Sequence, residues 1–135
     1  AGARANLRSA FAAFVTQADF RYHMFDPSGR LVGSTGLHAI KWAVPRCEIG
    51  YWVRSDATGK GYAAAAVRAL SGVGFEQLGV RRIDIRCDDE NLASARVAEK
   101  CGYRLEGVLR NYTVGTNGDV RHERVYALTQ LSDLR

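Results

Sequence analysis

Hydrophobic residues recur with two different periods along the chain, and the period changes where glycine or proline interrupts the sequence. Apolar residues three or four positions apart indicate helices with one buried face. Alternating or aromatic-rich stretches of four to eight residues indicate strands. The predicted helices are residues 3–18, 61–78 and 91–101. The predicted strands are residues 20–26, 30–40, 46–53, 81–87, 103–112 and 120–129.

Turn residues separate these segments and define their order. Asp26-Pro27-Ser28-Gly29 predicts a turn with proline at its second position, and residues 115–118 predict a hairpin. Gly79 and Gly102 are the expected helix stops. A strand–helix–strand crossover from residue 46 to 87 adds a parallel pair to an antiparallel sheet. We therefore expect an α/β fold with a mixed sheet, formed by a single domain over residues 1–135.

Composition supports one globular domain and excludes several other classes. The chain has 135 residues, of which 47% are hydrophobic and 24% charged, so disordered, collagen-like and coiled-coil proteins are excluded. It contains no run of about 18 apolar residues, so no membrane-spanning helix is expected. Neither does its start resemble a secretory signal. Cys47, Cys87 and Cys101 match no metal-site spacing, which favours reduced, buried thiols in a cytoplasmic protein.

The formal net charge is +5, but the basic residues are scattered. A nucleic-acid-binding domain more often carries a basic stripe with interleaved aromatic residues, so we expect no nucleic-acid partner. The positive balance is equally compatible with a phosphate-rich small ligand or an acidic partner.

The candidate chemistry begins at the loop from Ser55 to Ala63, between a strand and a long helix. Gly59 and Gly61 let the backbone turn sharply and approach a ligand closely. The first amides of the following helix, together with its dipole, form an anion site suited to a pyrophosphate. The loop is neither a Walker loop nor a full GxGxxG, and a plain strand-to-helix turn is the alternative interpretation.

Six segments, in order over residues 30–128, carry a resemblance to a known family. They are Glu48–Val53, Gly59–Ala63, Arg86-Cys87, Asn91–Ser94, Ala98–Tyr103 and Leu105–Arg110. With them the chain resembles the GNAT superfamily of acetyl-CoA-dependent N-acetyltransferases, and more narrowly the ribosomal-protein N-terminal acetyltransferase branch (RimJ/RimL-like). The resemblance implies a mostly antiparallel GNAT sheet, flanked by helices and splayed between the strands over 46–53 and 81–87. Acetyl-CoA would lie in that wedge.

The resemblance also implies where the cofactor binds. The pyrophosphate would lie on the backbone of residues 58–63, and the pantetheine arm would pair with residues 51–53. A backbone N–H near Trp52 or Val53 would polarise the thioester carbonyl. Asn91 would contact the cofactor arm or an ordered water. The implied cofactor-binding residues are Tyr51, Trp52, Val53, Thr58, Gly59, Lys60, Gly61, Tyr62, Ala63 and Asn91.

Three residues are the candidate catalytic groups: Ser94, Glu48 and Asn91. By resemblance, Ser94 would protonate the departing CoA thiolate. The alternative for Ser94 and Asn91 is helix capping, since asparagine is a favoured N-cap residue. Tyr103 is the alternative acid, although an aromatic residue that starts a strand is more often part of the core.

A general base must take a proton from the attacking amine. Glu48, on the strand that faces the wedge and on the same strand face as Gly50 and Trp52, is the candidate, and we expect burial in the wedge to raise its pKa. The alternative for Glu48 is an exposed or salt-bridged carboxylate. His38 on the preceding strand is a second candidate base, although a single strand histidine is more often a packing residue.

The chain departs from the family pattern at three places. Thr58 stands where Gln or Arg is usual, and Ala64-Ala65 stand where this branch often has Thr-Glu. The usual first strand and helix are expected to be missing, so the chain would be a fragment or a shortened member. Because those elements help to wall the acceptor site, the acceptor is less defined than the cofactor.

These observations predict an enzyme that transfers an acetyl group from acetyl-CoA to a primary amine, by direct attack with no acyl-enzyme and no metal. A protein N-terminal α-amine is the expected acceptor. The alternatives are a small-molecule amine as acceptor, or a non-catalytic acyl-CoA-binding module. A homodimer is plausible because an uncovered sheet edge tends to pair.

Overall fold

The computed structural model describes residues 8–9, 12 and 19–135 of the chain. The helix predicted over residues 3–18 therefore lies outside the described residues except at those three positions, which are helical. The strands are β1 (Phe20–Phe25), β2 (Leu31–Lys41), β3 (Arg46–Val53), β4 (Arg82–Asp88), β5 (Arg104–Val114) and β6 (Val120–Leu128). The helices are α2 (Tyr62–Gly72) and α3 (Leu92–Lys100), with short helical turns η1 (Ser55–Ala57), η2 (Val73–Gln77) and η3 (Leu131–Asp133).

The six described strands form one mixed sheet in the order β1-β2-β3-β4-β6-β5. All neighbouring strands are antiparallel except β3 and β4, which are parallel and joined through α2. This arrangement confirms the predicted fold class and the predicted crossover. The turns at residues 26–29 and 115–118 close as expected, because Gly29 N donates to Asp26 O and Gly118 N donates to Gly115 O.

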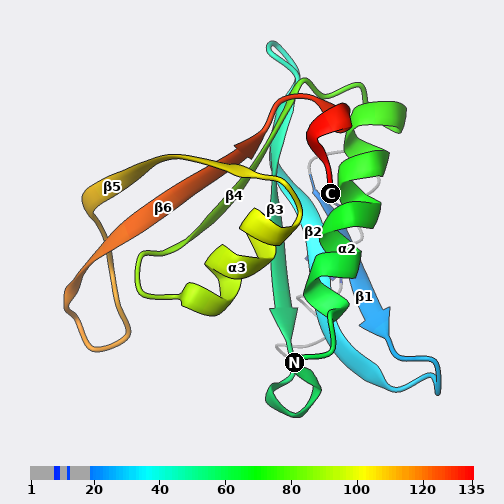
Figure 1. The fold of residues 1–135 in the computed structure, drawn as a ribbon, viewed down its shortest axis with the longest axis horizontal. Helices are drawn as coiled ribbons and strands as arrows, with labels where there is room; N and C mark the ends of the chain where they lie inside the picture. Colours follow the sequence, from blue (N-terminus) through cyan, green and yellow to red (C-terminus); the bar gives the residue numbers. More distant parts are fainter. Residues whose placement is uncertain (1–7, 10–11, 13–18) are drawn as a thin grey trace.

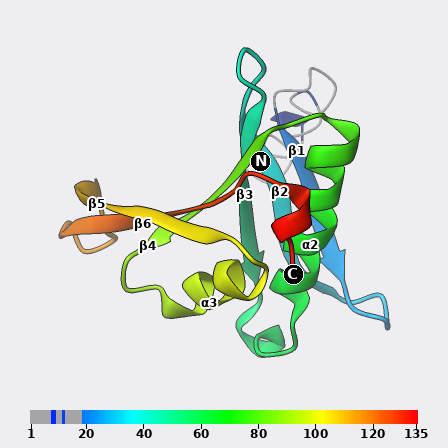
Figure 2. The ribbon, with the colours of Figure 1, turned by 45° about the horizontal axis from the view of Figure 1, so that its top comes forward.

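The two parallel strands separate after a short paired stretch. Only Arg46–Glu48 of β3 pair with Arg82–Asp84 of β4, and beyond that point the strands diverge (Figure 1). Figure 2 shows the result: β4, β6 and β5 extend as an arm away from the part formed by β1–β3 and α2. The predicted splay of the sheet is therefore confirmed, and it leaves the edge of β3 without a strand partner where the chain enters the glycine-containing loop.

The hydrophobic core lies between the sheet and the two helices α2 and α3, which pack on the same face. Alternate residues of β3 and β4 supply the sheet side, including Ile49 and Ile83, while Val67 and Ala98 supply the helix side. The three cysteines are buried, as predicted, and form no disulfide with one another, and burial raises the pKa of Cys47 to about 12. Such thiols pack as small apolar side chains.

The long helix ends in a wider turn that the hydrophobic pattern did not predict. After Gly72 the chain forms the π-helical turn η2, and Gly79, with φ +70°, ends the segment as expected. Glycine at position 74 lets this turn approach the sheet, since a Cβ there would lie 2.8 Å from Ile83 Cδ1. In the described part of the chain, no helix is long and apolar enough to cross a membrane.

Candidate active site

The loop that follows β3 has the geometry that its glycines predict. Gly59 and Gly61 have φ of +77° and +82°, in the left-handed region that favours glycine. Gly61 is the N-cap of α2, and Ala65 N donates the first helical hydrogen bond to Gly61 O. The amides of residues 62–64 precede that bond and have no partner within the helix. They carry the partial positive charge of the helix amino terminus toward the wedge.

The free edge of β3 presents a defined set of backbone groups. Arg54 N donates to Val32 O, so the backbone groups of Arg54 point toward β2. The β2–β3 register is regular from Gly33 opposite Val53 onward, and antiparallel strands alternate the direction of their backbone groups. The amides of Tyr51 and Val53 therefore face the wedge, whereas that of Trp52 faces β2. This alternation favours Val53 over Trp52 as the donor to a thioester carbonyl.

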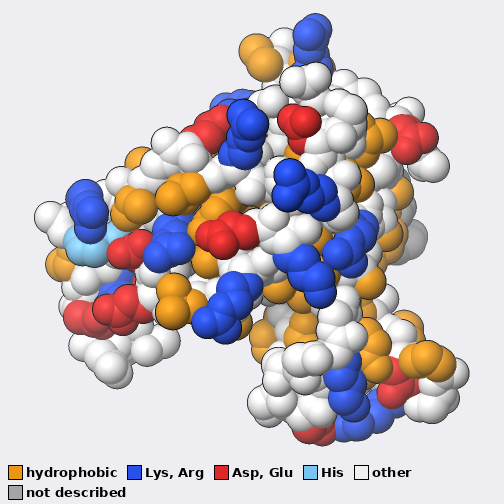
Figure 3. All heavy atoms as spheres, in the orientation of Figure 1, with side chains coloured by type: hydrophobic (Ala, Val, Ile, Leu, Met, Phe, Trp, Pro, Cys, Tyr) orange, Lys and Arg blue, Asp and Glu red, His pale blue; other side chains and the backbone are white. Residues whose placement is uncertain are grey.

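A cavity of about 500 Å³ occupies the wedge between β3, the loop and α3. Nine of the ten predicted cofactor-binding residues line it; Lys60 does not, and is exposed. Figure 3 shows the molecule indented between the lobe that carries α3 and the lobe below α2, with basic side chains nearby. The full lining is Tyr51, Trp52, Val53, Ala57, Thr58, Gly59, Gly61, Tyr62, Ala63, Ala64, Asn91, Ala93, Ser94, Arg96, Val97 and Lys100.

The charged side chains among the described residues that line this cavity are all basic. Arg96 and Lys100 line it from α3, and no acidic side chain is among the described residues that do so. These two cations were not among the predicted site residues. Their spacing of four residues, which puts them on one helix face, is the signal that could have found them. Two cations and the amides at the start of α2 suit a ligand with several phosphate charges.

The start of α3 places two predicted site residues at the cavity. Asn91 is the N-cap of α3 and its Oδ1 accepts a hydrogen bond of 3.1 Å from Ser94 N. The capping interpretation of Asn91 is therefore confirmed, and the residue also lines the cavity. Ser94 lines the cavity as well, and its side chain is free of the cap, because the bond to Asn91 uses the Ser94 amide.

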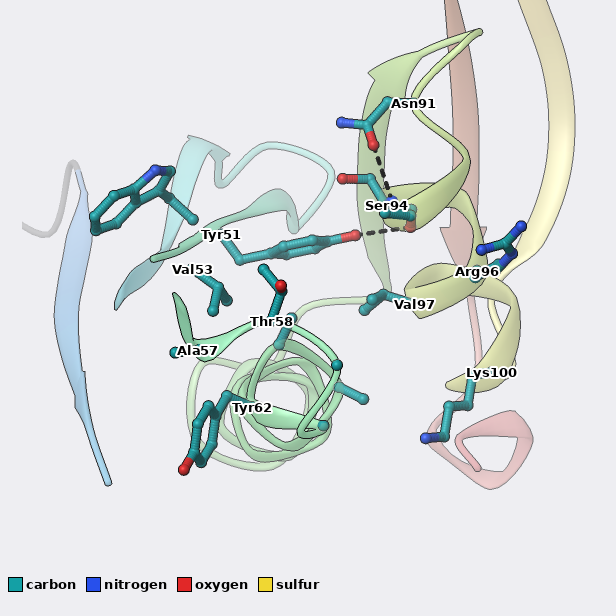
Figure 4. Close-up of a pocket in the computed structure, with 16 residues that line it drawn as sticks. Tyr51, Val53, Ala57, Thr58, Tyr62, Asn91, Ser94, Arg96, Val97 and Lys100 are labelled. Atoms are coloured by element: carbon teal, nitrogen blue, oxygen red, sulfur yellow. Dashed lines mark hydrogen bonds between the residues drawn. The ribbon is translucent and has the colours of Figure 1, made fainter. Parts of the chain in front are cut away.

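Tyr51 spans the wedge from β3 to α3 (Figure 4). Its hydroxyl donates a 2.9 Å hydrogen bond to the carbonyl oxygen of Ser94. Burial raises the pKa of Tyr51, and the protonated hydroxyl is the donor in this bond. The contact fixes the distance between the free edge of β3 and the helix that carries Ser94. Thr58, the departure from the family pattern, lines the cavity and donates from its hydroxyl to Ser55 O at 3.0 Å.

Tyr103 lies in the core and away from the cavity. It is 3% exposed, its hydroxyl is 2.7 Å from Ser71 Oγ, and burial raises its pKa. The interpretation of Tyr103 as a packing residue is confirmed.

Glu48 has an environment that differs from the expected one. It does not line the wedge cavity, and its side chain forms ion pairs with His38 at 3.1 Å and with Arg86 at 3.0 Å. The hydrogen bond from His38 lowers the pKa of Glu48 more than burial raises it. The expectation that burial raises this pKa is therefore wrong, and the salt-bridge alternative is confirmed.

A second cavity of about 450 Å³ lies over β1, β2 and β3. Tyr51 and Trp52 line both cavities, so both cavities border the carboxyl-terminal half of β3. His38 lines the second cavity and is about half exposed, with a pKa raised by its hydrogen bond to Glu48. His38 is therefore partly buried and also forms an ion pair. Among the described residues, no group of three or more His, Cys, Asp or Glu is placed to hold a metal ion.

Comparison with known proteins places these features in a family. Residues 1–104 match the family model described as "Acetyltransferase (GNAT) domain". The chain is 34% identical over 100 residues to the uncharacterized N-acetyltransferase YoaA of Bacillus subtilis, a match that covers 74% of this chain and 56% of YoaA. It is 32% identical over 80 residues to the ribosomal-protein-serine acetyltransferase of Escherichia coli, covering 59% of this chain and 45% of that protein.

A solved structure shares the fold. The microcin C7 self immunity acetyltransferase MccE, determined in complex with acetyl-CoA and AMP, superposes with a TM-score of 0.84 at 23% identity. The superposition covers 93% of this chain and 70% of MccE. The chain spans 46% to 66% of the length of the first three curated relatives that it matches.

Proposed function

The chain belongs to the GNAT acetyltransferase family, and from that premise we propose that it transfers an acetyl group from acetyl-CoA to a primary amine. The observation that carries this proposal is the wedge cavity. It brings together the free edge of β3, the glycine loop with the unpaired helix amides of residues 62–64, and the side chains of Arg96 and Lys100. The second cavity contains neither the glycine loop nor these two cations. Acetyl-CoA has a matching set: a pantetheine amide chain, a pyrophosphate and a thioester.

The residues present fit this cosubstrate in three separate ways. The amides of residues 62–64 bind the pyrophosphate, and Arg96 and Lys100 add positive charge beside it. The backbone of Tyr51 and Val53 pairs with the pantetheine amides as a further strand would. The amide of Val53 then donates to the carbonyl oxygen on which negative charge develops. Acetyl-CoA supplies the acetyl group as an activated thioester.

Ser94 completes the proposed site from the opposite wall. Its position at the first turn of α3, held against β3 by the hydrogen bond from Tyr51, places its hydroxyl at the cavity. We assign it the role of protonating the CoA sulfur as that group leaves. Asn91 holds the turn that presents Ser94, and it lines the same cavity. The amine attacks the thioester directly, so the site needs no protein nucleophile.

The acceptor enters from the second cavity in this proposal. That cavity shares Tyr51 and Trp52 with the wedge cavity, and it is lined by both an acidic and a basic side chain, Asp19 and Arg21. We propose a protein N-terminal α-amine as the acceptor. The supporting observation is the similarity to the ribosomal-protein-serine acetyltransferase of Escherichia coli.

Two measurements test the proposed function in sequence. Calorimetric titration with acetyl-CoA should give binding that weakens strongly when acetyl-pantetheine, which lacks the pyrophosphate half, replaces it. Release of free CoA thiol is then measured with a peptide that begins with serine, the same peptide with a blocked N-terminus, and a polyamine. Turnover with the free peptide alone supports an N-terminal acceptor. Turnover with the polyamine alone contradicts it, and binding without turnover on any amine contradicts the enzyme assignment.

The proposal also covers the oligomeric state and the cellular location of the protein. We propose that the protein forms a homodimer, because β5 forms an edge of the described sheet and exposes Leu105, Tyr112 and Val114. Sedimentation velocity on the protein tests it, and a monomer at all concentrations contradicts it. We also propose a cytoplasmic location, which the use of acetyl-CoA supports.

A further inference from the structure

The sheet face beneath the second cavity is arranged in cross-strand rows. His38 of β2 lies opposite Glu48 of β3, Gly36 lies opposite Gly50, and Ser34 lies opposite Trp52. Residues directly opposite each other share a face of the sheet. The middle row therefore has no side chain on either strand, and the cavity of about 450 Å³ has its floor there. Side chains of the flanking rows, His38 among them, form its walls.

The imidazole of His38 leans over this glycine row. A Cβ on Gly50 would lie 3.0 Å from His38 Cε1 and 3.5 Å from Nδ1. The other ring nitrogen, Nε2, lies 3.1 Å from Glu48 Oε2. A carboxylate accepts only from a protonated nitrogen, so this contact selects the neutral tautomer with hydrogen on Nε2. Nδ1 is then the ring atom with a free lone pair, on the side of Gly50 and the cavity.

Glu48 is held in place and is a poor proton acceptor. Its second oxygen, Oε1, lies 3.0 Å from Arg86 Nε of β4, so both oxygens face cationic or donor groups. These contacts lower the pKa of Glu48 and raise that of His38. Asp19, near the start of β1, raises the pKa of His38 further, and Arg46 lowers that of Glu48. Arg21, which lines the same cavity, adds a positive charge on the β1 side.

Position along β3 also favours the histidine. Gly50, over which the imidazole lies, is two residues from Trp52, which is about 7 Å along β3 at the usual strand rise. Glu48 is four residues from Trp52, which is about 13 Å along the strand. Trp52 and Tyr51 are the residues that line both cavities. A group over Gly50 therefore lies between Glu48 and the place where the acetyl group binds. A general base can act on the attacking amine directly or through one water molecule.

We propose that His38 is the general base of the reaction and that Glu48, supported by Arg86, is its positioning residue. This inference rests on the proposed acetyl transfer. Nδ1 of the neutral imidazole takes one proton from the attacking amine, directly or through a water, as the C–N bond forms and the C–S bond breaks. The electron pair of the C–S bond goes to sulfur, which receives a proton from Ser94. The imidazolium then releases its proton to solvent, and solvent restores the proton of Ser94.

The pH dependence of turnover distinguishes His38 from Glu48 as the base. In the parent protein, kcat should rise with pH through a pKa above 6.5, the ordinary value of histidine. His38→Gln should lower kcat about 100-fold, the usual contribution of a general base, and abolish that rise. Glu48→Gln should leave most of the activity and move the rise to lower pH, because the imidazolium loses its anionic partner. Ionisation of the amine itself is common to all variants and cancels in the comparison.

A matched control removes a different histidine from the same sheet face. His23 lies on β1 opposite Ser34 and does not line the cavity, so His23→Gln should match the parent in both kcat and pH profile. Full activity in His38→Gln overturns the proposal. So does loss of all activity in Glu48→Gln, which would identify Glu48 as the base.

A spectroscopic measurement tests the arrangement without turnover. Long-range ¹H–¹⁵N spectra of the histidine rings report the tautomer and pKa of each imidazole. His38 should show hydrogen on Nε2 when neutral, and its pKa should fall in Glu48→Gln. Hydrogen on Nδ1 overturns the proposal. If the spectra agree but no amine is acetylated by the parent protein, the proposed function has failed and the geometry of the histidine stands.

Discussion

Replacement of Gly61 by alanine isolates the contribution of one backbone conformation to the proposed cofactor site. The residue has φ +82°, and no heavy atom lies within 4 Å of the position that a Cβ would take. Crowding is therefore absent, and the whole effect comes from the left-handed conformation. That conformation costs an alanine about 1–2 kcal/mol. We expect Gly61→Ala to lower the free energy of unfolding by about that amount, which corresponds to a Tm lower by roughly 3–8 °C.

The same strain acts on ligand binding. If the loop relaxes to a negative φ, the amides at the start of α2 turn away from the wedge, and the pyrophosphate loses donors. A loss of about 1.4 kcal/mol in binding raises the Kd tenfold. We therefore expect the Kd for acetyl-CoA to rise by about 5–10-fold in Gly61→Ala, with little change for acetyl-pantetheine. Calorimetric titration of the folded variant measures both values, and urea denaturation measures the stability.

A second glycine supplies the control for this prediction. A Cβ on Gly107 of β5 would also meet nothing within 4 Å, but the residue has no left-handed φ. Gly107→Ala should leave stability unchanged or slightly higher, because alanine reduces the entropy of the unfolded chain. It should also leave acetyl-CoA binding unchanged. If Gly61→Ala is as stable as Gly107→Ala and binds acetyl-CoA as tightly as the parent, the argument from backbone strain and amide donors is refuted.

Four further predictions follow from single contacts. Ser94→Ala should lower kcat at least tenfold while the Kd for acetyl-CoA changes less than twofold; equal rates would remove Ser94 from the mechanism. Asn91→Ala should lower the free energy of unfolding by about 1 kcal/mol through loss of the α3 cap, and Asn91→Ser should retain it, both measured by urea denaturation. Tyr103→Phe should lower the free energy of unfolding by about 1 kcal/mol and leave the pH profile of kcat unchanged. A shifted profile would make Tyr103 a candidate general acid again. Because the pKa of Glu48 is lowered, its carboxylate stabilises the fold at pH values above 4.5, the ordinary pKa of glutamate. Because the pKa of His38 is raised, its imidazolium stabilises the fold at pH values below 6.5, the ordinary pKa of histidine. The stability lost in Glu48→Gln should therefore be largest between about pH 5 and 6.5 and should shrink on both sides; a loss that does not vary with pH contradicts the ion pair.

The local features of the proposed cofactor site were predictable because they depend on neighbouring residues. The strand over 46–53 was predicted with the bounds that the structure shows, and the glycine loop and the start of α3 follow it as expected. Period-two alternation placed Glu48, Gly50 and Trp52 on one face of β3. Asn91 was an evident N-cap candidate from residue type and position alone. Each of these inferences spans only a few consecutive residues.

The features that failed or were missed depend on register and on packing between distant segments. Burial was expected to raise the pKa of Glu48, but the β2–β3 register places His38 directly opposite and β4 brings Arg86 to its other side. Arg96 and Lys100 belong to the cavity only because α3 packs across the wedge from β3. Alternation defines the face on which a side chain lies, but it does not define which residue of the neighbouring strand lies beside it.

The sequence by itself determined the elements, the mixed sheet with its crossover, and the loop whose glycines suit an anion. These follow from short-range periodicity and from backbone conformations that few residues adopt. Only the tertiary structure decided that β3 and β4 separate after three paired residues, that Tyr51 bridges the opening to Ser94, and that His38 lies over a row of glycines beside Glu48. The physical reason is that ion pairs, cavities and pKa values depend on distances between segments far apart in the chain, and folding alone sets those distances.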